Sequence, residues 1–434
     1  MTVYWAEYAW LPDGLAAGVR IDVRGTAIHA VAADTAPTGT RLRGLTVPGF
    51  ANAHSHAFHR ALRGRTQHDQ GTFWTWRERM YAVAARLDPD SYYRLARAVY
   101  AEMVLAGYTS VGEFHYLHHG PGGVPYADPT AMSGALAAAA ADAGIRLTLL
   151  DTCYLAGGFG VDLGAHQLRF SDGTVDAWAT RAAAFTPEPE LVRTGVAAHS
   201  VRAVPADALS VVAAAAAGRP LHVHLSEQPA ENSDCLAAHG LTPTALLAKT
   251  GVLGPRTVAV HATHLTGVDI GQLADSGTRA CFCPTTERDL GDGIGPARAL
   301  ADAGVGLCLG TDSHAVIDAF EEWRALELDE RLASRARGRF TPAELYRAAT
   351  DHASIGWPEA GRIAPGAAAD LVTVDLSSIR TAGTAPAAAL FAAAASDVHS
   401  VLIAGRPVVS EHRHLHVDQP ATVLREEIEA LCRP

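Results

Sequence analysis

The strongest constraint on the fold is a regular alternation of short apolar runs with alanine-rich runs through the middle of the chain. The apolar runs have the length and composition of buried strands, and the alanine-rich runs have those of helices. Strands that alternate with helices form parallel βαβ units. The expected strands are 110–114, 146–150, 193–197, 221–225, 257–260, 279–283 and 305–309, and examples of expected helices are 89–106, 131–143, 206–217 and 296–303.

An eighth strand of this series is expected just before His56, after the turn at Pro48 and Gly49. Eight units predict an α/β protein with a (β/α)8 TIM barrel, whose active site lies at the carboxyl ends of its strands. Strand-like runs also occur near both ends, at 18–23, 27–31, 370–375 and 400–409. We expect them to form a small β-sandwich domain from both termini, at 1–47 and 366–434, around a barrel at 48–365.

The composition argues against several classes of protein. The net charge of −11 and the pI near 6.0 argue against a nucleic-acid-binding surface. Residues 1–10 do not read as a signal peptide, and no apolar run reaches the roughly 20 residues that a membrane span needs, so we expect a cytoplasmic protein without membrane contact. The six cysteines are too few and scattered for a disulfide framework, and we expect them to be ordinary core residues.

Several of the expected strands end in side chains that can bind a metal ion. His54 and His56 are one residue apart on an extended segment, so both project to the same side and can bind one ion. Other strand ends carry His224 with Glu227, then His261, then Asp312. Buried imidazoles and carboxylates are costly unless they share a partner. The pattern predicts one metal site with four ligands, His54, His56, His224 and Asp312, and with Glu227 and His261 beside it.

With these motifs, nearly the whole chain resembles the amidohydrolase superfamily. The motifs are HSH at 54–56, HVHLSE at 222–227, VHATH at 260–264, LGTDS at 309–313 and the closing GRIAPGAAADLVTVDL at 361–376. Many members of this superfamily bind two metals through a carboxylated lysine at the end of the fourth strand. The only lysine here, Lys249, lies in the helical run 244–250, and the fourth strand leads instead to His199. The sequence is therefore similar to the mononuclear, deaminase-like branch.

Within that branch, the chain resembles the formimidoylglutamate deiminases. The resemblance rests on HSHAFHRALRG at 54–64, TFWTWRE at 72–78, GEFHYLHH at 112–119 and AAHSVRAV at 197–204, with His59 at a position where some members have glutamine. It implies hydrolysis of N-formimino-L-glutamate to N-formyl-L-glutamate and ammonia, in histidine degradation, and a homodimer.

The residues fit this chemistry. One divalent ion, Zn²⁺ by preference with Fe²⁺ or Mn²⁺ as alternatives, would lower the pKa of a bound water toward ~7 and supply a hydroxide nucleophile. Asp312 is placed to accept the proton of that water. Glu227 can pair with the amidinium nitrogens and then protonate the departing ammonia. His261 would donate a hydrogen bond to the attacking oxygen and stabilise the tetrahedral intermediate.

The substrate also has two carboxylates, which the planar guanidinium of arginine can bind through two parallel hydrogen bonds. Arg202 is the first candidate, with Tyr116 and His59 as its helpers. Arg77 is a further candidate, although the 72–78 segment could equally be a lid helix held by its tryptophans. His199 is expected to line the pocket. Four other histidines are assigned to packing or supporting contacts: His118, His119, His222 and His264.

Two other interpretations are open. A deaminase of the same mechanism that acts on a cyclic amidine, of the guanine, adenosine or triazine type, would keep every metal ligand but would need aromatic or amide groups in its pocket. The second interpretation is a barrel that has lost catalysis and serves as a binding scaffold. Such a protein would be expected to have lost metal ligands or the catalytic acid. All six metal-site residues are present.

Overall fold

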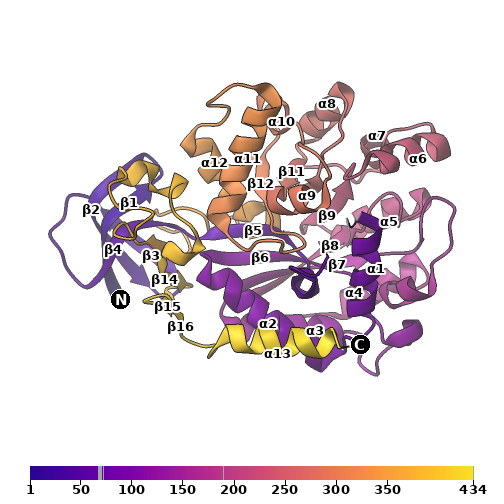
Figure 1. Ribbon diagram of the computed structural model, residues 1–434, viewed down its shortest axis with the longest axis horizontal. Helices are drawn as coiled ribbons and strands as arrows, with labels where there is room; N and C mark the ends of the chain where they lie inside the picture. Colours follow the sequence, from indigo (N-terminus) through magenta and orange to yellow (C-terminus); the bar gives the residue numbers. More distant parts are fainter. Residues whose placement is uncertain (67–70, 72, 189, 434) are drawn as a thin grey trace.

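The computed structural model describes residues 1–433 except 67–70, 72 and 189, and the side chains of Phe73 and Trp74 are also outside the description. Two separate eight-stranded sheets account for all the named strands in these residues. One sheet is parallel and is surrounded by helices, and the other is mixed and lies at one end of the molecule (Figure 1). None of the helices in the described residues is long and apolar enough to cross a membrane.

The parallel sheet is the expected barrel, with its strands in sequence order around it. Nearly every residue of these strands is buried, as in a sheet covered on both faces. An isolated parallel bridge between Ser55 and Asp312 joins the first strand to the segment after the last. The strands are β5 (Phe50–Ser55), β6 (Tyr108–His115), β7 (Arg146–Cys153), β8 (Val192–Ala198), β9 (Leu221–Leu225), β10 (Thr257–His261), β11 (Arg279–Phe282) and β12 (Leu307–Leu309).

Helices connect these strands and cover the barrel (Figure 1). Local signals begin and end them: Asp88 caps α2 in a capping box with Ser91, and a left-handed Gly144 ends α3. The helices are α1 (Phe73–Ala84), α2 (Pro89–Leu105), α3 (Ala131–Ala143), α4 (Val175–Ala184), α5 (Ala206–Ala216), α6 (Pro229–His239), α7 (Pro243–Lys249), α8 (Gly267–Ser276), α9 (Pro284–Leu290), α10 (Ala297–Asp302), α11 (Ala319–Ser334) and α12 (Pro342–Ala349), with short 3-10 turns η1 (Ala57–Leu62), η2 (Pro121–Gly123), η3 (Ala165–Phe170) and η4 (His352–Ile355).

The second sheet is built from both ends of the chain, as expected. Its strand order is β16-β15-β14-β13-β4-β1-β2-β3, so the predicted sandwich domain is one hydrogen-bonded mixed sheet. Strands β4 and β13 join the two halves in antiparallel pairing, and β1 and β4 are parallel. The strands are β1 (Thr2–Leu11), β2 (Gly14–Arg24), β3 (Ala27–Ala32), β4 (Thr40–Pro48), β13 (Leu371–Val374), β14 (Val398–Ile403), β15 (Arg406–Ser410) and β16 (Arg413–His414).

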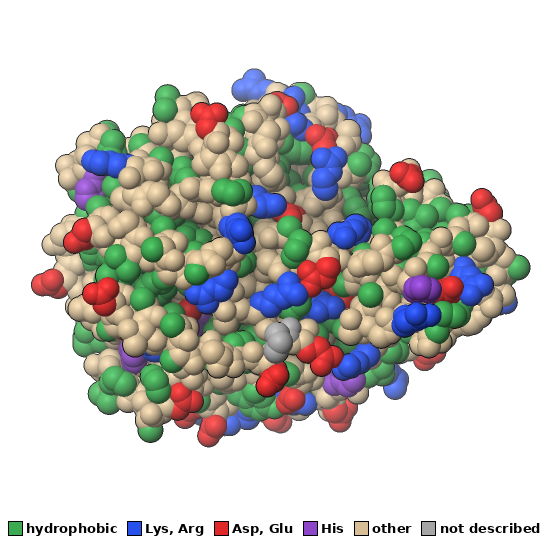
Figure 2. Space-filling model, turned by 180° about the vertical axis from the view of Figure 1, so that it is seen from behind, with side chains coloured by type: hydrophobic (Ala, Val, Ile, Leu, Met, Phe, Trp, Pro, Cys, Tyr) green, Lys and Arg blue, Asp and Glu red, His purple; other side chains and the backbone are tan. Residues whose placement is uncertain are grey.

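The C-terminal segment also reaches the barrel. After η5 (Pro386–Phe391), η6 (Ala395–Asp397) and the last strands, α13 (Pro420–Leu431) lies along α2 (Figure 1). Arg94 of α2 pairs with Glu427 of α13 at 2.6 Å. Five of the six cysteines are buried and all six are free, as expected for core residues. On the face seen from behind, basic and acidic side chains are interspersed (Figure 2).

Candidate active site

Closure of the barrel brings the ends of its first and last strands together. The N–H groups of Thr311 and Asp312 both donate to the carbonyl of His54, at 3.1 and 3.0 Å. Gly310 makes this approach possible, because a Cβ there would lie 2.7 Å from the Cβ of His54. Asp312 adopts a left-handed backbone, with φ of 41°. Residues more than 250 apart in sequence are thus joined by the backbone itself, before any ligand is present.

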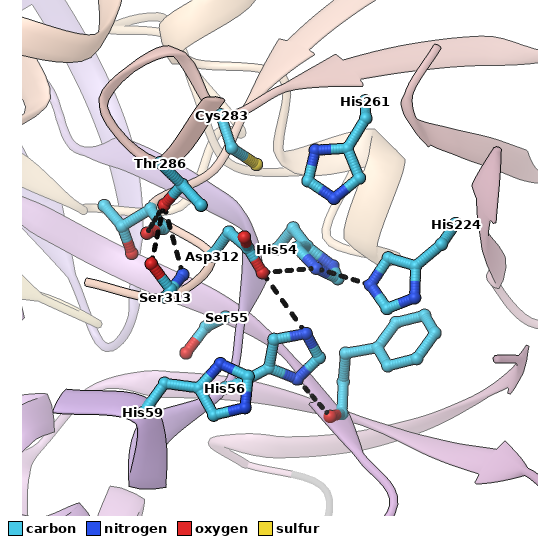
Figure 3. A network of polar contacts seen from close by, with 12 residues as sticks. His54, Ser55, His56, His59, His224, His261, Cys283, Thr286, Asp312 and Ser313 are labelled. Carbon is cyan, nitrogen blue, oxygen red and sulfur yellow. Dashed lines mark hydrogen bonds and ion pairs between the residues drawn. The ribbon is translucent and has the colours of Figure 1, made fainter. Parts of the chain in front are cut away.

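The four expected metal ligands converge at this closure (Figure 3). The Nε2 atoms of His54 and His56 lie 3.1 and 3.3 Å from Oδ1 of Asp312. The Nε2 of His224 lies 3.1 Å from the Nε2 of His54. His54, His224 and Asp312 form a group with His261 in which one ligand atom of each lies within 4.8 Å of the others, and His56, His59 and Asp312 form a second such group.

The donor set fits a divalent ion. Burial lowers the pKa of His54 to about 3, so its ring is neutral and offers a lone pair. His56 donates from Nδ1 to the carbonyl of Phe114 at 2.9 Å, so its other ring nitrogen, Nε2, is the one directed at the cluster. Lone pairs and a carboxylate packed this closely, in residues that are at most 6% exposed, need a shared cation. Three imidazoles and one carboxylate suit zinc or a similar ion.

Glu227 and His261 lie beside this cluster as a pair. Nε2 of His261 is 3.8 Å from Oε1 of Glu227, and Nδ1 of the same ring is 3.3 Å from Oε1 of Glu287. Burial alone would lower the pKa of His261, but the two carboxylates raise it to about 10. These carboxylates favour the protonated ring, which can donate a hydrogen bond into the site. Burial raises the pKa of Glu227, which favours a carboxyl that can hold a proton.

A pocket opens from these residues. Its lining combines metal ligands, acid and base groups, arginines and aromatic rings: His56, His59, Trp76, Arg77, Met80, Tyr81, Tyr116, Tyr154, Phe170, His199, Arg202, His224, Glu227, His261, Leu290 and Asp312. All five residues predicted to bind substrate are in this set. Arg77 is on α1, and its guanidinium carbon lies 5.7 Å from the ring centre of Tyr81. Thr72 and the side chains of Phe73 and Trp74, in the same motif, lie outside the described residues.

Arg202 is held in place at the pocket wall by a carboxylate that the sequence analysis did not identify. Its Nε donates to Oε2 of Glu231 at 2.7 Å, and its Nη2 lies 3.9 Å from Oε2 of Glu227. Glu231 is 1% exposed and also accepts the N–H of Ser226. The guanidinium is therefore oriented on one side and keeps N–H groups for a second anion.

His59 and Tyr116 form one unit of the wall. Nε2 of His59 and the hydroxyl of Tyr116 are 2.8 Å apart. Burial lowers the pKa of His59 well below its usual value, so the ring is neutral. Its Nδ1 is buried and has no hydrogen-bond partner in the described part of the chain. The ring of His199 packs edge-on against that of Tyr116, with the two ring centres 5.5 Å apart.

The histidines assigned to packing each contact the protein itself. Nε2 of His222 donates to the carbonyl of Ser354 at 3.0 Å, and that of His264 donates to the carbonyl of Asp292 at 2.8 Å. His118 donates to the carbonyl of Thr152, and His119 lies 3.0 Å from Asp172. Lys249 is exposed at the end of α7.

Three acidic residues near the site were missed: Glu231, Glu287 and Asp292. One oxygen of Asp292 lies within 4.8 Å of ligand atoms of both Glu227 and His261. The first two lie in the helices that begin just after β9 and β11, where a polar side chain can reach back to the strand end. Asp292 follows α9 in a glycine-rich loop, and its spacing gives no comparable signal.

Known proteins match this architecture. The family model described as Amidohydrolase family matches residues 45–408. Formimidoylglutamate deiminase of Pseudomonas aeruginosa is 37% identical, over 97% of each chain, and 8-oxoguanine deaminase of the same species is 30% identical over 84% of this chain and 82% of its own.

Solved structures have the same fold. An amidohydrolase from Brucella melitensis superposes with a TM-score of 0.90 at 33% identity over 100% of both chains. An adenosine deaminase from Xanthomonas campestris with bound zinc has the same fold, with a TM-score of 0.85 at 24% identity over 99% of this chain and 98% of its own. The chain therefore belongs to the amidohydrolase family and is a hydrolase that acts on a carbon-nitrogen bond.

Proposed function

We propose that this enzyme hydrolyses the amidine of N-formimino-L-glutamate, releasing ammonia and N-formyl-L-glutamate. One observation carries the proposal: the pocket that begins at the metal-type cluster is also lined by two arginines, Arg77 and Arg202. A linear substrate with a cationic amidine at one end and two carboxylates at the other matches that distribution of charge. The 37% identity to a formimidoylglutamate deiminase along nearly the whole chain supports the same substrate.

The metal is proposed to be a single divalent ion held by His54, His56, His224 and Asp312. Zinc is the first choice, and Fe²⁺ or Mn²⁺ would fit the same donors. When bound, the ion acts as a Lewis acid that polarises the reacting carbon-nitrogen group and lowers the pKa of a water in the site. Lys249 lies at the end of α7 and supplies no bridging ligand for a second metal.

Glu227, His261 and Asp312 are proposed to move and hold the protons. Glu227 accepts hydrogen bonds from the amidinium nitrogens, takes the hydroxyl proton of the tetrahedral intermediate as the formyl C=O forms, and passes that proton to the nitrogen that departs as ammonia. The protonated His261 donates a hydrogen bond to the oxygen that becomes the formyl oxygen, and Glu287 on its other nitrogen keeps the ring in that orientation. Asp312 accepts a proton from the attacking water.

Substrate orientation is proposed to come from the opposite side of the pocket. Arg202, preset by Glu231, binds one carboxylate through its free N–H groups, and Arg77 on α1 binds the other. Tyr116 and His59, which are hydrogen-bonded to each other, together supply one donor to these carboxylates, and His199 contributes to the wall. A neutral His59 has one ring N–H, so it can donate one hydrogen bond, as the side-chain amide of a glutamine also can.

A second candidate is a deaminase of a cyclic amidine such as a purine. The aromatic part of the pocket favours it, since Trp76, Tyr81, Tyr154 and Phe170 offer surfaces on which a flat ring can stack. Similarity to an 8-oxoguanine deaminase also favours it. Two arginines in the same pocket argue for the linear dicarboxylate, because a guanidinium can bind a carboxylate through two parallel hydrogen bonds and a neutral ring has no carboxylate to offer.

The biological setting is proposed from the substrate. A deiminase of this kind would act in histidine degradation in the cytoplasm, as a homodimer whose protomers each have a barrel at 48–365 and a β domain at 1–47 and 366–434. Product analysis tests the chemistry: incubation in H₂¹⁸O should give N-formyl-L-glutamate with one ¹⁸O atom and one equivalent of ammonia. Formation of formamide and glutamate in its place would refute the proposed bond cleavage.

A further inference from the structure

A second cavity lies at the opposite end of the barrel from the active site. Its volume is about 610 Å³ and it is formed where β8, β9, β10 and β11 begin, together with the segment that follows η4. Among the residues that the structure describes, its lining includes four arginines and no acidic side chain: Arg193, Arg219, Arg256 and Arg279. The reaction proposed above uses none of these residues, so this cavity is independent of that proposal.

The guanidinium groups of the cavity are oriented by the protein. Arg219 donates to the carbonyls of Ala215 and Ala216 and to the hydroxyl of Thr194, at 2.8 to 3.1 Å. Arg256 donates through one Nη to the carbonyl of Gly218. These contacts leave N–H groups of both side chains available, because an arginine has five. The donors are held in position before a ligand arrives, which lowers the entropy cost of binding.

The charges of the four arginines are only partly balanced. Arg193 pairs with Glu359 at 2.6 Å and stacks on Trp357, with its guanidinium carbon 3.7 Å from the ring centre. Arg279 pairs with Asp351 at 2.9 Å. Arg219 and Arg256 have backbone or hydroxyl partners, but neither forms an ion pair within the part of the chain that the structure describes. Two positive charges in the cavity thus have no carboxylate partner.

We propose that this cavity binds a small dianion, either a phosphate group or a dicarboxylate, between Arg219 and Arg256. A ligand with two negative charges would neutralise the two unpaired guanidinium groups, and its oxygens would accept their remaining N–H groups. The cavity is also wide enough for the body of a ligand that carries such a group. Bound there, the dianion would bridge the loops that precede β9 and β10. The opposite ends of these two strands contain His224 and His261.

Titration calorimetry of the metal-loaded enzyme at constant ionic strength tests this site. The probes are hydrogen phosphate and succinate at pH 7.5, with acetate as the monoanion. We expect one of the two dianions to bind, acetate to bind at least tenfold more weakly, and Arg256→Gln and Arg219→Gln each to weaken the dianion about tenfold. Phosphate and succinate are run separately, so the stronger of them identifies the ligand chemistry.

Two control variants locate the binding. Arg337→Gln removes an exposed arginine from the loop after α11, far along the chain from the cavity, and should leave dianion binding unchanged. Arg202→Gln/Glu231→Gln removes an arginine of the active-site pocket together with its buried partner and should leave dianion binding to the cavity unchanged. Dianion binding that disappears in this folded double variant but persists in Arg256→Gln would assign it to the active site and overturn the proposal. Absence of binding by both dianions would overturn it as well.

Discussion

Replacement of Arg202 separates substrate binding from metal chemistry. Its Nε is occupied by Glu231 at 2.7 Å, and the rest of the guanidinium is available to the pocket that contains Glu227 and Asp312. Arg202 is not a metal ligand in the proposed site. Its loss should therefore weaken binding of the substrate carboxylate and leave the metal content unchanged.

The expected magnitude follows from the hydrogen bonds lost. A hydrogen bond to a charged group contributes about 1.5–3 kcal/mol, and a guanidinium can make two to one carboxylate. The side chain is 26% exposed, so water reduces this contribution, and we take about 3 kcal/mol for the pair. Each 1.4 kcal/mol is a factor of ten, so KM should rise about 100-fold. kcat should fall less, because Glu227 and His261 are still present.

Truncation of Arg202 to alanine should also lower the stability of the fold. Arg202→Ala leaves Glu231, which is 1% exposed, as a buried carboxylate without its cation, and breaking a buried pair in this way costs about 3–5 kcal/mol. The double variant Arg202→Gln/Glu231→Gln removes both charges together and should retain more stability. Glu231→Gln alone is the matched control, because it keeps the arginine and the acceptor for Ser226.

Steady-state ammonia release from N-formimino-L-glutamate is the assay, with metal content and thermal unfolding measured on the same samples. We expect a KM about 100-fold higher for the double variant and within a few-fold of wild type for Glu231→Gln. A double variant that is folded, metal-loaded and unchanged in KM would refute the role of Arg202 in carboxylate binding.

Three further predictions concern the acid, the metal and the pH dependence of stability. Glu227→Gln should lower kcat at least ~100-fold in the ammonia assay with its metal content intact; near-normal turnover would exclude Glu227 as the proton donor. Chelation should abolish ammonia release and lower the melting temperature, because the buried ligands lose their shared partner, and added Zn²⁺ should restore both; full activity without metal would contradict the site. Burial lowers the pKa of His118 to about 4 from an ordinary 6.5, so folding favours its neutral form, and stability that is complete above pH 6.5 should be lost as the pH falls toward 4. One pKa unit corresponds to 1.36 kcal/mol, so protonation of His118 should account for roughly 3 kcal/mol of the loss in unfolding free energy between pH 6.5 and pH 4. In urea unfolding, His118→Gln should therefore lose roughly 3 kcal/mol less than the wild type over this pH range. An equal loss in both proteins would contradict this role of His118.

Much of the barrel could be predicted because its strands and helices are marked locally. Strand 221–225 and helix 131–143 match the structure at both ends, since an apolar run and an alanine run each stop at clear turn residues. The predicted ends of strands were wrong where tertiary contacts decide where a strand stops. The strand at 279–283 ends at Phe282, because Cys283 is already the N-cap of α9. β1 was not predicted, since Thr2–Leu11 acquires its pairing from β2 and from the distant β4.

The residues of the candidate site also fall into a group that could be predicted from the sequence and a group that could not. The metal-type residues were visible because each lies at or just beyond a strand end, where the fold alone brings them together. Glu231 and Glu287 were not, because their importance depends on which way a helix turns after the strand. The partner of Arg202 and the second partner of His261 therefore depend on the direction in which α6 and α9 leave the strand ends, which their positions in the sequence suggest but do not decide.

The central claim is that a mononuclear amidohydrolase site acts here on a linear dicarboxylate amidine. It is tested most directly by kcat/KM for ammonia release from N-formimino-L-glutamate, N-formimino-L-aspartate and guanine, with metal analysis of the same protein. We predict one divalent ion per chain and a kcat/KM for N-formimino-L-glutamate at least 100-fold above that for guanine. Turnover of guanine with none of N-formimino-L-glutamate would contradict the claim.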